Sequence, residues 1–507
     1  MENIIALDIG TSGTRAIIYN AKGEAMAAFS HEYHSVFPQA GWVEQDPDSW
    51  KRAAVDVLFR TADFMKDRSL KASGIAVTSQ RSSLIPMDAS GTALRYAVMW
   101  QDKRTIQQCE DLKSTYGMEN LYKITGLRVN PYFVLPKILW FRQNEPGLYG
   151  KAHKMLGVQD YVVHCMTGCY ATDYTQAGRT MLFNISEFHW EEALLRLAGL
   201  TEENLPRLLP PGSIAGHLNA EFAALTSLPK GLPVVISGGD QQNAAAALGV
   251  TEPGIAEANT GTGSFVLAYA DFAHFDPSCR VLVQASAIAG KWVMEAGIFN
   301  TGSVYRWFKE QFYPELAGDA KPYIKMDEEA AGAGPGSHGV LLMPHFEGSA
   351  APYWNPLAKG MFFNLSLASK RGDLARAILE GIAMEVKGCL ELIEEVSGKI
   401  TAVNVAGGMV KSDLFCRIQS GFYDRPVIRR KNSEASSLGA AMVAAPALGL
   451  YAGVEDAVKA MSAGVEQVFQ PHPKDLRAAE LLLAAKKRLY EALDKAAVYQ
   501  TFMNLTP

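Results

Sequence analysis

The sequence predicts an α/β protein built from two related domains, and its length and a repeated hairpin pattern support that prediction. A chain of 507 residues is too long for a single hydrophobic core, so two domains with a cleft between them are expected. Residues 4–20 indicate two strands, rich in β-branched and apolar residues, around a turn of Gly, Thr and Ser. Residues 256–267 have the same form, with a Gly-Thr pair in each turn, at 10–11 and 261–262. This internal repeat predicts a duplicated fold.

The elements expected in the first half alternate between strand and helix. Strands are predicted at 25–33, 72–79 and 234–237, and the last of these leads through two glycines into a helix at 244–248. A helix is expected at 50–65 with Asp46 or Asp48 as its cap, and another helical region starts at Val98. Turn residues gather at 249–254, which places the domain boundary there and divides the chain into 1–250 and 251–507.

The second half repeats this order. After the second hairpin, a helix is expected to open within 297–307, and a long amphipathic helix spans 374–396, where apolar residues recur every four positions. A strand at 403–406 ends in two glycines, and the chain is predicted to be helical from Ala457 onward.

Composition excludes several classes of partner. A net charge of −5 without a long basic run argues against nucleic acid as the main partner. The uncharged stretch between Glu434 and Glu455 is rich in Ala and Gly and broken by Pro446, so it predicts a packed helix pair rather than a membrane span.

The N-terminal sequence and the cysteines predict a cytoplasmic protein. The apolar N-terminal run ends at Asp8 and follows no basic region, which argues against a signal peptide. The six cysteines are scattered and lack zinc-ribbon spacing, so reduced thiols in the cytoplasm are expected.

The first hairpin has the composition of a phosphate-binding turn. Gly10 and Gly13 let backbone N–H groups approach an anion, and Asp8 offers a hard oxygen that suits Mg²⁺ or its waters. The turn also offers hydroxyl donors from Thr11, Ser12 and Thr14. A plain hairpin with a polar turn is the alternative. The second copy favours two phosphate-binding hairpins that act on one nucleotide.

Asp240 is the strongest catalytic candidate. It follows a buried strand and two glycines and opens a helix, so its carboxylate is expected at the mouth of a cleft, where it could accept a hydroxyl proton during phosphoryl transfer. A helix-capping aspartate is the alternative, and position alone favours it.

Arg81 offers donors to a polyhydroxylated ligand or a carboxylate, and Tyr132 could stack on a small substrate. A structural salt bridge and a half-buried core aromatic are the corresponding alternatives.

Several short stretches occur in a fixed order along nearly the whole chain, from Ile5 to about Leu450. They are ALDIGTSGTRA, GWVEQDP, SQR, NPYF with a following lysine, TDYTQAGRTMLFNI, GDQQ, NTGTGSF, APYWNP and AGG. This set resembles the FGGY carbohydrate kinases, and within that family it is nearest to the glycerol kinases. The resemblance implies two duplicated RNase H-like domains of the actin, Hsp70 and sugar kinase superfamily, with a cleft between them.

The resemblance also implies roles for individual residues. Asp8 would help to place Mg²⁺, and Asp240 would be the catalytic base. The nucleotide would be bound by Thr11, Ser12, Gly13, Arg15, Thr262, Gly302, Arg306, Gly408 and Ser412. The acceptor would be bound by Arg81, Tyr132, Asp240 and Gln241, with Phe265 packed beneath it. Members of the family are often dimers or tetramers, so a homo-oligomer is expected.

Ser82 departs from the glycerol kinase pattern. Glycerol kinases carry a glutamate after the arginine, where this chain has Arg81-Ser82, and that glutamate accepts hydrogen bonds from substrate hydroxyls. A site built to bond a hydroxyl can discriminate by roughly 10⁴-fold. Serine widens the pocket and removes an anionic acceptor, which predicts a four- or five-carbon polyol or ketose. The Gln-Met-His motif of xylulose kinases is absent, which argues against xylulose.

The sequence therefore predicts a kinase that uses ATP and Mg²⁺ to phosphorylate a hydroxyl of a small sugar or polyol by direct in-line transfer. Glycerol kinase proper is the first alternative. A nucleotide-dependent sensor without catalysis and an ATP hydrolase that works by shape change are further alternatives. The presence of Asp240, of both hairpins and of the acceptor residues argues against the last two.

Overall fold

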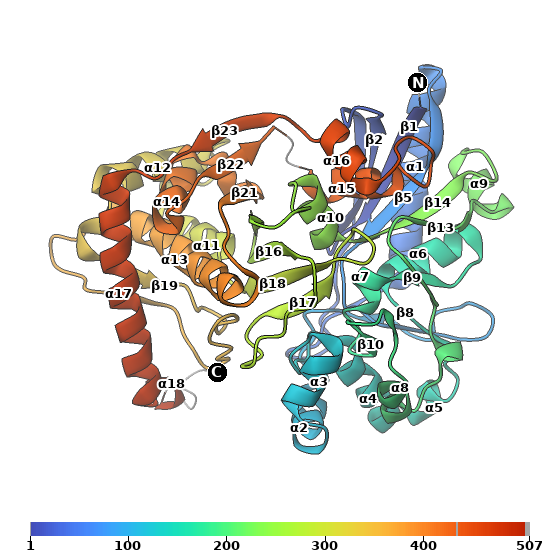
Figure 1. The fold of residues 1–507 in the computed structure, drawn as a ribbon, viewed down its shortest axis with the longest axis horizontal. Helices are drawn as coiled ribbons and strands as arrows, with labels where there is room; N and C mark the ends of the chain where they lie inside the picture. Colours follow the sequence, from blue (N-terminus) through green and yellow to red (C-terminus); the bar gives the residue numbers. More distant parts are fainter. Residues whose placement is uncertain (1, 432–433, 502–507) are drawn as a thin grey trace. The chain divides into compact units, whose positions relative to one another are not determined.

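The computed structural model describes residues 2–431 and 434–501, and these form two compact units (Figure 1). The first unit comprises Met1–Thr251, Ala270–Val293 and Glu434–Ala463, and the second comprises Glu252–Tyr269, Met294–Ser433 and Gly464–Pro507. The first unit's main segment thus ends beside the predicted boundary at residue 250, and two later segments also belong to that unit.

The first unit is organised around a six-stranded mixed sheet. The order across the sheet is β3 (Ala25–Glu32), β2 (Gly13–Asn20), β1 (Glu2–Ile9), β5 (Lys71–Ser79), β14 (Pro233–Gly239) and β13 (Ser213–His217). Strands β1, β2 and β3 pair antiparallel, whereas β1, β5 and β14 run parallel. The carboxyl ends of β1, β5 and β14 therefore lie at one edge of the sheet, which is where ligands bind in open α/β sheets.

Helices cover the buried strands of this sheet. Helix α1 (Pro47–Asp67) begins at the predicted cap Asp46, whose carboxylate accepts from the backbone N–H of Asp48 at 3.1 Å. Helix α15 (Ala435–Ala444) packs against β1, β5 and β14 and against α10 (Asp240–Ala247). Small residues allow this close packing, because a Cβ at Gly439 would overlap the carbonyl of Asn243.

The remaining elements of the first unit are short. The helices are α2 (Ile106–Thr115), α3 (Met118–Thr125), α4 (Val134–Asn144), α5 (Pro146–Tyr149), α6 (Val158–Thr167), α7 (Tyr174–Ala177), α8 (Glu192–Ala198), α9 (Ala220–Thr226) and α16 (Val454–Met461). The strands are β4 (Glu44–Gln45), β6 (Ile85–Met87), β7 (Ala97–Val98), β8 (Lys154–Leu156), β9 (Ala171–Asp173), β10 (Phe183–Asn184), β11 (His189–Trp190), β12 (Arg207–Leu209) and β17 (Leu282–Ala285).

The second unit repeats the same strand arrangement. Its order is β18 (Trp292–Ile298), β16 (Ser264–Ala270), β15 (Ile255–Thr260), β21 (Ala402–Ala406), β22 (Val427–Arg430) and β23 (Val465–Phe469). Strands β15 and β16 form an antiparallel hairpin, and β15, β21 and β22 run parallel. The hairpin β15–β16 therefore takes the place that β1–β2 has in the first unit, which confirms the predicted duplication.

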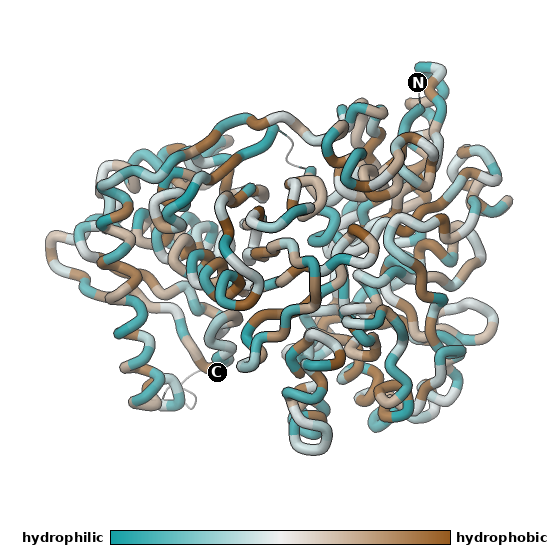
Figure 2. Tube along the Cα trace, viewed as in Figure 1, coloured by the Kyte–Doolittle hydropathy of each residue, from teal (hydrophilic) through white to brown (hydrophobic). Residues whose placement is uncertain are grey.

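Helices surround the second sheet. They are α11 (Gly302–Phe312), α12 (Pro322–Ala333), α13 (Arg371–Ser397), α14 (Asp413–Tyr423), α17 (Pro473–Lys495) and α18 (Val498–Thr501), and a small sheet is formed by β19 (Leu341–Met343) and β20 (Met361–Phe363). Helix α13 contains the predicted helix at 374–396. Hydrophilic and hydrophobic segments alternate along α17 in Figure 2, as expected for a helix with one buried face.

Three predicted helix boundaries were wrong. The region after Val98 forms a turn, and α2 starts only at Ile106. Gly297 lies in β18, whose residues 293–296 are buried as sheet core, and α11 starts at Gly302. The tail is not helical throughout, because β23, which contains Val465 and Val468, pairs with β22 before α17 begins.

Among the described residues, no helix combines the length and the apolar character needed to cross a membrane.

Candidate active site

The turn of the first hairpin is held in one shape by hydrogen bonds. It closes on itself through Gly10 N–H, which donates to the carbonyl of Gly13 at 2.9 Å. The Tyr33 hydroxyl donates to the Gly10 carbonyl at 2.6 Å, and the Gln45 amide donates to the Thr11 carbonyl at 2.6 Å. These bonds occupy the turn's carbonyl groups, while Ser12 is exposed at its tip. The turn can therefore present donors to an anion.

The second hairpin has an equivalent turn in the other unit. Gly261 N–H donates to the Gly263 carbonyl at 2.9 Å, as in the first hairpin. The start of α11 contacts this turn, because Gly302 N–H donates to the Gly261 carbonyl at 3.0 Å and Thr301 N–H donates to the Thr262 carbonyl at 3.0 Å. A Cβ at Gly302 would overlap the Gly261 carbonyl, so the approach requires glycine. Thr262 and Gly302 thus lie close together in the second unit.

The other predicted nucleotide residues of the second unit lie on three elements. Gly408 starts a short helical turn after β21, and the preceding Gly407, with φ of 94°, passes close to the Thr260 carbonyl. Ser412 caps α14 by accepting from Phe415 N–H at 3.1 Å. Arg306 is exposed on α11. Phe265, which was predicted to pack beneath the acceptor, also belongs to the second unit and lies on β16 beside Gly297.

Asp240 is the first residue of α10 and lies where β14 ends. The N-cap position belongs to Gly239 and α10 has no side-chain cap hydrogen bond, so Asp240 is not the capping residue that its position in the sequence favours. The Arg81 guanidinium Nε lies 3.4 Å from Asp240 Oδ1, and Gln241 N–H donates to the same oxygen at 2.8 Å. The Asp240 side chain is 28% exposed and that of Arg81 only 1%. Asp240 thus has a buried cation beside it and an open side towards solvent.

Arg81, Ser82 and Tyr132 form a connected group of residues (the wall), and within it Arg81 lies beside this carboxylate. Ser82 is buried, and its backbone has a positive φ of 69°. The buried ammonium of Lys137 donates to the carbonyls of Ser82 at 3.0 Å and of Tyr132 at 2.6 Å, which ties the two residues together. Burial lowers the pKa of Lys137 to about 7. The structure therefore holds Tyr132 next to Ser82, which follows Arg81 in the chain.

Two residues that the sequence did not single out belong to this wall. Arg179 is buried, donates from Nε to Ser82 Oγ at 3.4 Å and holds its guanidinium 5.0 Å from the Tyr132 ring centre. The Trp100 ring lies 5.2 Å from the Tyr132 ring, and its indole N–H donates to Thr11 Oγ1 at 3.1 Å. Trp100 thus links Tyr132 to the turn of the first hairpin. Arg179 lies in the TDYTQAGRTMLFNI stretch, whereas no sequence pattern marked Trp100.

Asp8 lies at the end of β1, and its carboxyl group has a raised pKa. Burial raises its pKa to about 7, and the nearby carboxylate of Asp240 acts in the same direction, while Arg15 opposes both. The Ser437 hydroxyl donates to Asp8 Oδ2 at 3.4 Å. Arg15, opposite Asp8 in the hairpin, forms an ion pair with Glu434. A cation bound beside Asp8 would stabilise the charged form of this carboxyl group.

The carboxylates of Asp8 and Asp240 suit Mg²⁺, which needs few ligands from the protein. Within residues 2–431 and 434–501, no group of three or more His, Cys, Asp or Glu side chains could hold a metal ion. Magnesium in phosphoryl-transfer sites is held by one or two carboxylates, water and the substrate's phosphates. Asp8 with Asp240 nearby fits that pattern.

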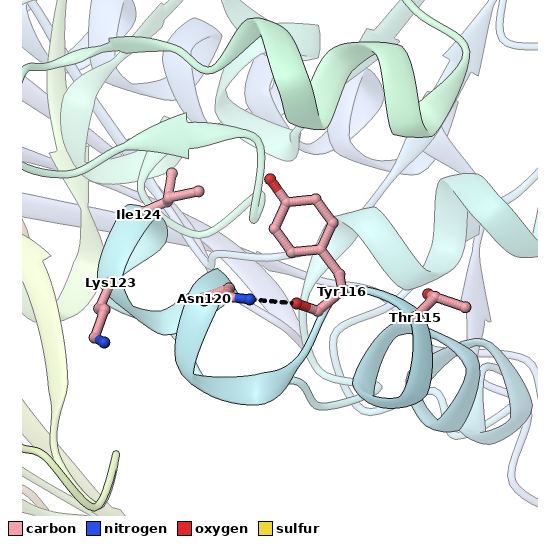
Figure 3. A pocket seen from close by; sticks show the side chains of 5 residues that line it. All are labelled: Thr115, Tyr116, Asn120, Lys123 and Ile124. Carbon is pink, nitrogen blue, oxygen red and sulfur yellow. Dashed lines mark hydrogen bonds between the residues drawn. The ribbon is translucent and has the colours of Figure 1, made fainter.

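A surface hollow lies elsewhere in the first unit. It has a volume of about 430 Å³ and is lined by Thr115, Tyr116, Asn120, Lys123 and Ile124 from α2 and α3 (Figure 3). The Asn120 amide donates to the Tyr116 carbonyl within the hollow itself. No predicted site residue lines it, so its size does not mark the site.

Comparison with known proteins identifies the family of the chain. The profile of the FGGY family of carbohydrate kinases matches residues 3–249 with its N-terminal domain and residues 256–448 with its C-terminal domain. A glycerol kinase from Thermococcus onnurineus is 32% identical over 477 residues, which cover 92% of this chain and 93% of that one. A glycerol kinase from Thermococcus kodakarensis is 30% identical and covers 98% of each chain.

Solved structures show the same fold. A xylulose kinase from Rhodospirillum rubrum has a TM-score of 0.90 with 27% identity, covering 97% of this chain and 99% of the other. A xylulose kinase from Lactobacillus acidophilus, at 24% identity, has a TM-score of 0.92 and covers 99% and 100% of the two chains. These findings confirm the predicted actin- and Hsp70-like fold with two domains. The chain belongs to the FGGY family of carbohydrate kinases and is a phosphotransferase with an alcohol group as acceptor.

Proposed function

We propose that the protein transfers the γ-phosphoryl group of ATP to a hydroxyl of a small sugar or polyol, with Asp240 as the general base. The observation that supports this proposal is the placement of Asp240. Its partly exposed carboxylate lies beside the buried Arg81 and interacts electrostatically with Asp8 on the first hairpin. A base, acceptor donors and an anion-binding turn are the parts that phosphoryl transfer needs.

The proposed reaction is a single in-line displacement. Asp240 accepts the proton of the acceptor hydroxyl as its oxygen bonds to the γ-phosphorus, and the bond from that phosphorus to the β–γ bridging oxygen breaks, so ADP leaves. Arg81, whose Nε lies 3.4 Å from Asp240 Oδ1, orients the carboxylate. Arg81 and Tyr132 hold the acceptor close to Asp240, which removes much of the entropic cost of the encounter.

Nucleotide binding is assigned to the two Gly-Thr hairpins. Thr11, Ser12, Gly13 and Arg15 would donate to phosphate oxygens in the first unit, and Thr262 has the equivalent position in the second. Arg306, Gly302, Gly408 and Ser412 would line the remainder of the nucleotide site. Mg²⁺ held by Asp8 would neutralise phosphate charge when bound.

The acceptor is proposed to be longer than glycerol. At position 82 a buried serine contacts Arg179, so this point of the wall has a small hydroxyl group rather than an acidic side chain. A four- or five-carbon polyol or ketose suits such a site. Glycerol kinase proper remains the second candidate, because the curated relatives at about 30% identity carry that name.

The test is a coupled ADP-release assay with MgATP and a panel of glycerol, erythritol, ribitol, xylitol, tetruloses, pentuloses and hexoses. One four- or five-carbon acceptor that raises the rate far above background would support the proposal. Preference for glycerol would overturn the argument from Ser82. ATP turnover that no acceptor raises would favour a hydrolase, and binding without turnover would favour a sensor.

We further propose that the protein acts in the cytoplasm. All six cysteines are free in the structure, although Cys165 and Cys169 lie only partly buried and four residues apart. Free thiols are typical of a reducing compartment, where ATP is also available.

A further inference from the structure

The side chain of Arg15 is held by a residue from a distant part of the chain. Arg15 lies on β2 directly opposite Asp8, and its guanidinium forms an ion pair with Glu434, the residue just before α15. The two side chains are 46% and 40% exposed. The Arg15 guanidinium, which is proposed to bind phosphate, is therefore already paired with a carboxylate.

The same end of α15 also contacts the second charged residue of the hairpin. Ser437, one turn after Glu434, donates to Asp8 Oδ2 at 3.4 Å. Glu434 also acts on Asp8 electrostatically. The start of α15 therefore contacts both Arg15 and Asp8, the proposed phosphate and Mg²⁺ residues.

Helix α15 is a rigid support for these contacts. Nine of its ten residues are buried, and it packs against β1, β5, β14 and α10. Gly439 lies so close to the Asn243 backbone that no side chain fits between the two helices. A carboxylate fixed to such a helix can define the position of a flexible arginine.

We infer that Glu434 is a positioning residue that holds the Arg15 guanidinium in place for the nucleotide phosphates. A guanidinium has five N–H donors in a fixed plane, so one edge can stay on Glu434 while another contacts a phosphate oxygen. Without Glu434, the long Arg15 side chain has to be ordered when the nucleotide binds. Ordering one such side chain corresponds to a loss of about 3- to 10-fold in affinity. This inference rests on the proposed function, because it assigns Arg15 to phosphate binding.

The alternative hypothesis is that Glu434 weakens nucleotide binding. Glu434 could instead act against the phosphates, because it neutralises Arg15 and adds negative charge near Asp8. The two ideas predict opposite signs, which makes the ion pair testable with one substitution.

The experiment measures MgADP binding to Glu434→Gln by isothermal titration calorimetry and the KM values for ATP and acceptor in turnover. Positioning predicts an affinity 3- to 10-fold weaker and a KM for ATP raised by the same factor, with the acceptor KM unchanged. Glu434→Asp, which keeps the charge, is expected to fall between the wild type and Glu434→Gln. Tighter binding, or no change, would overturn the inference.

Two further variants control the result. Glu192→Gln removes a matched exposed Arg–Glu pair, Arg196–Glu192 on α8, and should leave both constants unchanged. Arg15→Gln with Glu434→Gln should bind MgADP no more weakly than Arg15→Gln alone, because Glu434 acts through Arg15; an additive loss contradicts this. The binding measurement needs no turnover, so it stays informative even if Asp240 proves not to be the general base.

Discussion

Asp240 differs from an ordinary helix-start aspartate in its surroundings, because Arg81 approaches it from a buried position while one side stays open. Asp240→Asn keeps the shape and the bond from Gln241 N–H but cannot accept a proton. We expect turnover to fall about 10²–10⁴-fold, with MgADP binding changed less than about twofold. Steady-state kinetics and calorimetry check both. Asp456→Asn, in the exposed first turn of α16, is the matched control. Turnover within a few-fold of the wild type contradicts the assignment.

Position 82 tests acceptor selectivity at the same scale. Ser82→Glu places a carboxylate next to Arg179, whose Nε already contacts Ser82 Oγ at 3.4 Å. We expect the ratio of kcat/KM for glycerol to that for the longer acceptor to rise at least about tenfold, because a hydroxyl gains a charged acceptor. Competition assays with both acceptors measure this ratio. Ser82→Gln has the same size without the charge. An equal shift in both variants would show that pocket volume, rather than charge, sets the preference.

At the scale of elements, α10, which begins with the proposed base Asp240, packs closely against α15. Gly439→Ala forces a Cβ into the Asn243 carbonyl on the helix that starts at Asp240. We expect the free energy of unfolding to fall by about 1–3 kcal/mol and kcat to fall with it, since α10 must shift. Chemical denaturation and kinetics measure the two effects. Gly332→Ala on α12 has no atom within 4 Å of the new Cβ, so it should be neutral or slightly stabilising. Unchanged kcat in Gly439→Ala would show that α10 tolerates the shift.

Helix α17 is attached to α13 by a buried charge cluster. Lys486 Nζ lies 2.7 Å and His345 Nε2 lies 3.0 Å from Glu385 Oε1, and all three side chains are at most 6% exposed. Burial alone would raise the pKa of Glu385, but Lys486 and His345 lower it to about 2, against an ordinary value of 4.5. Its contribution to stability is therefore complete above pH 4.5 and is lost as the pH falls from 4.5 towards 2.

Lys486→Met leaves the Glu385 carboxylate buried without its main partner. We expect a loss of about 3–5 kcal/mol at pH 7 and a weaker dependence on acid between pH 4.5 and 2, because the pKa of Glu385 returns upward. Denaturation series at several pH values check both effects. Lys487→Met, the exposed neighbour on α17, is the control. A loss below about 1 kcal/mol would show that the cluster is not a main anchor of α17.

For the whole molecule, local patterns in the sequence predicted much of the fold. The hairpins and the strand before Asp240 were predictable because β-branched runs and glycine turns are local features. The strand at 465–469 was missed because its pairing with β22 depends on residues distant in sequence. Trp100 and Glu434 were missed for the same reason. Each contacts a predicted site residue only after folding, and neither belongs to a local motif.

The first unit is built from segments that are distant in sequence, so a fragment that contains only the first of them is expected to be unstable. Helix α15 packs on β1, β5 and β14 but comes from residues 435–444, so a truncated chain of residues 1–251 exposes the core face that this helix covers. We expect residues 1–251 to bind a hydrophobic dye and to lack a cooperative unfolding transition, because stability depends on apolar burial. Joining 434–463 to 1–251 through about 20 Gly-Ser residues, which span about 25 Å, should restore cooperative unfolding. Cooperative unfolding of 1–251 alone, measured by calorimetry, would show instead that α15 is dispensable for this core.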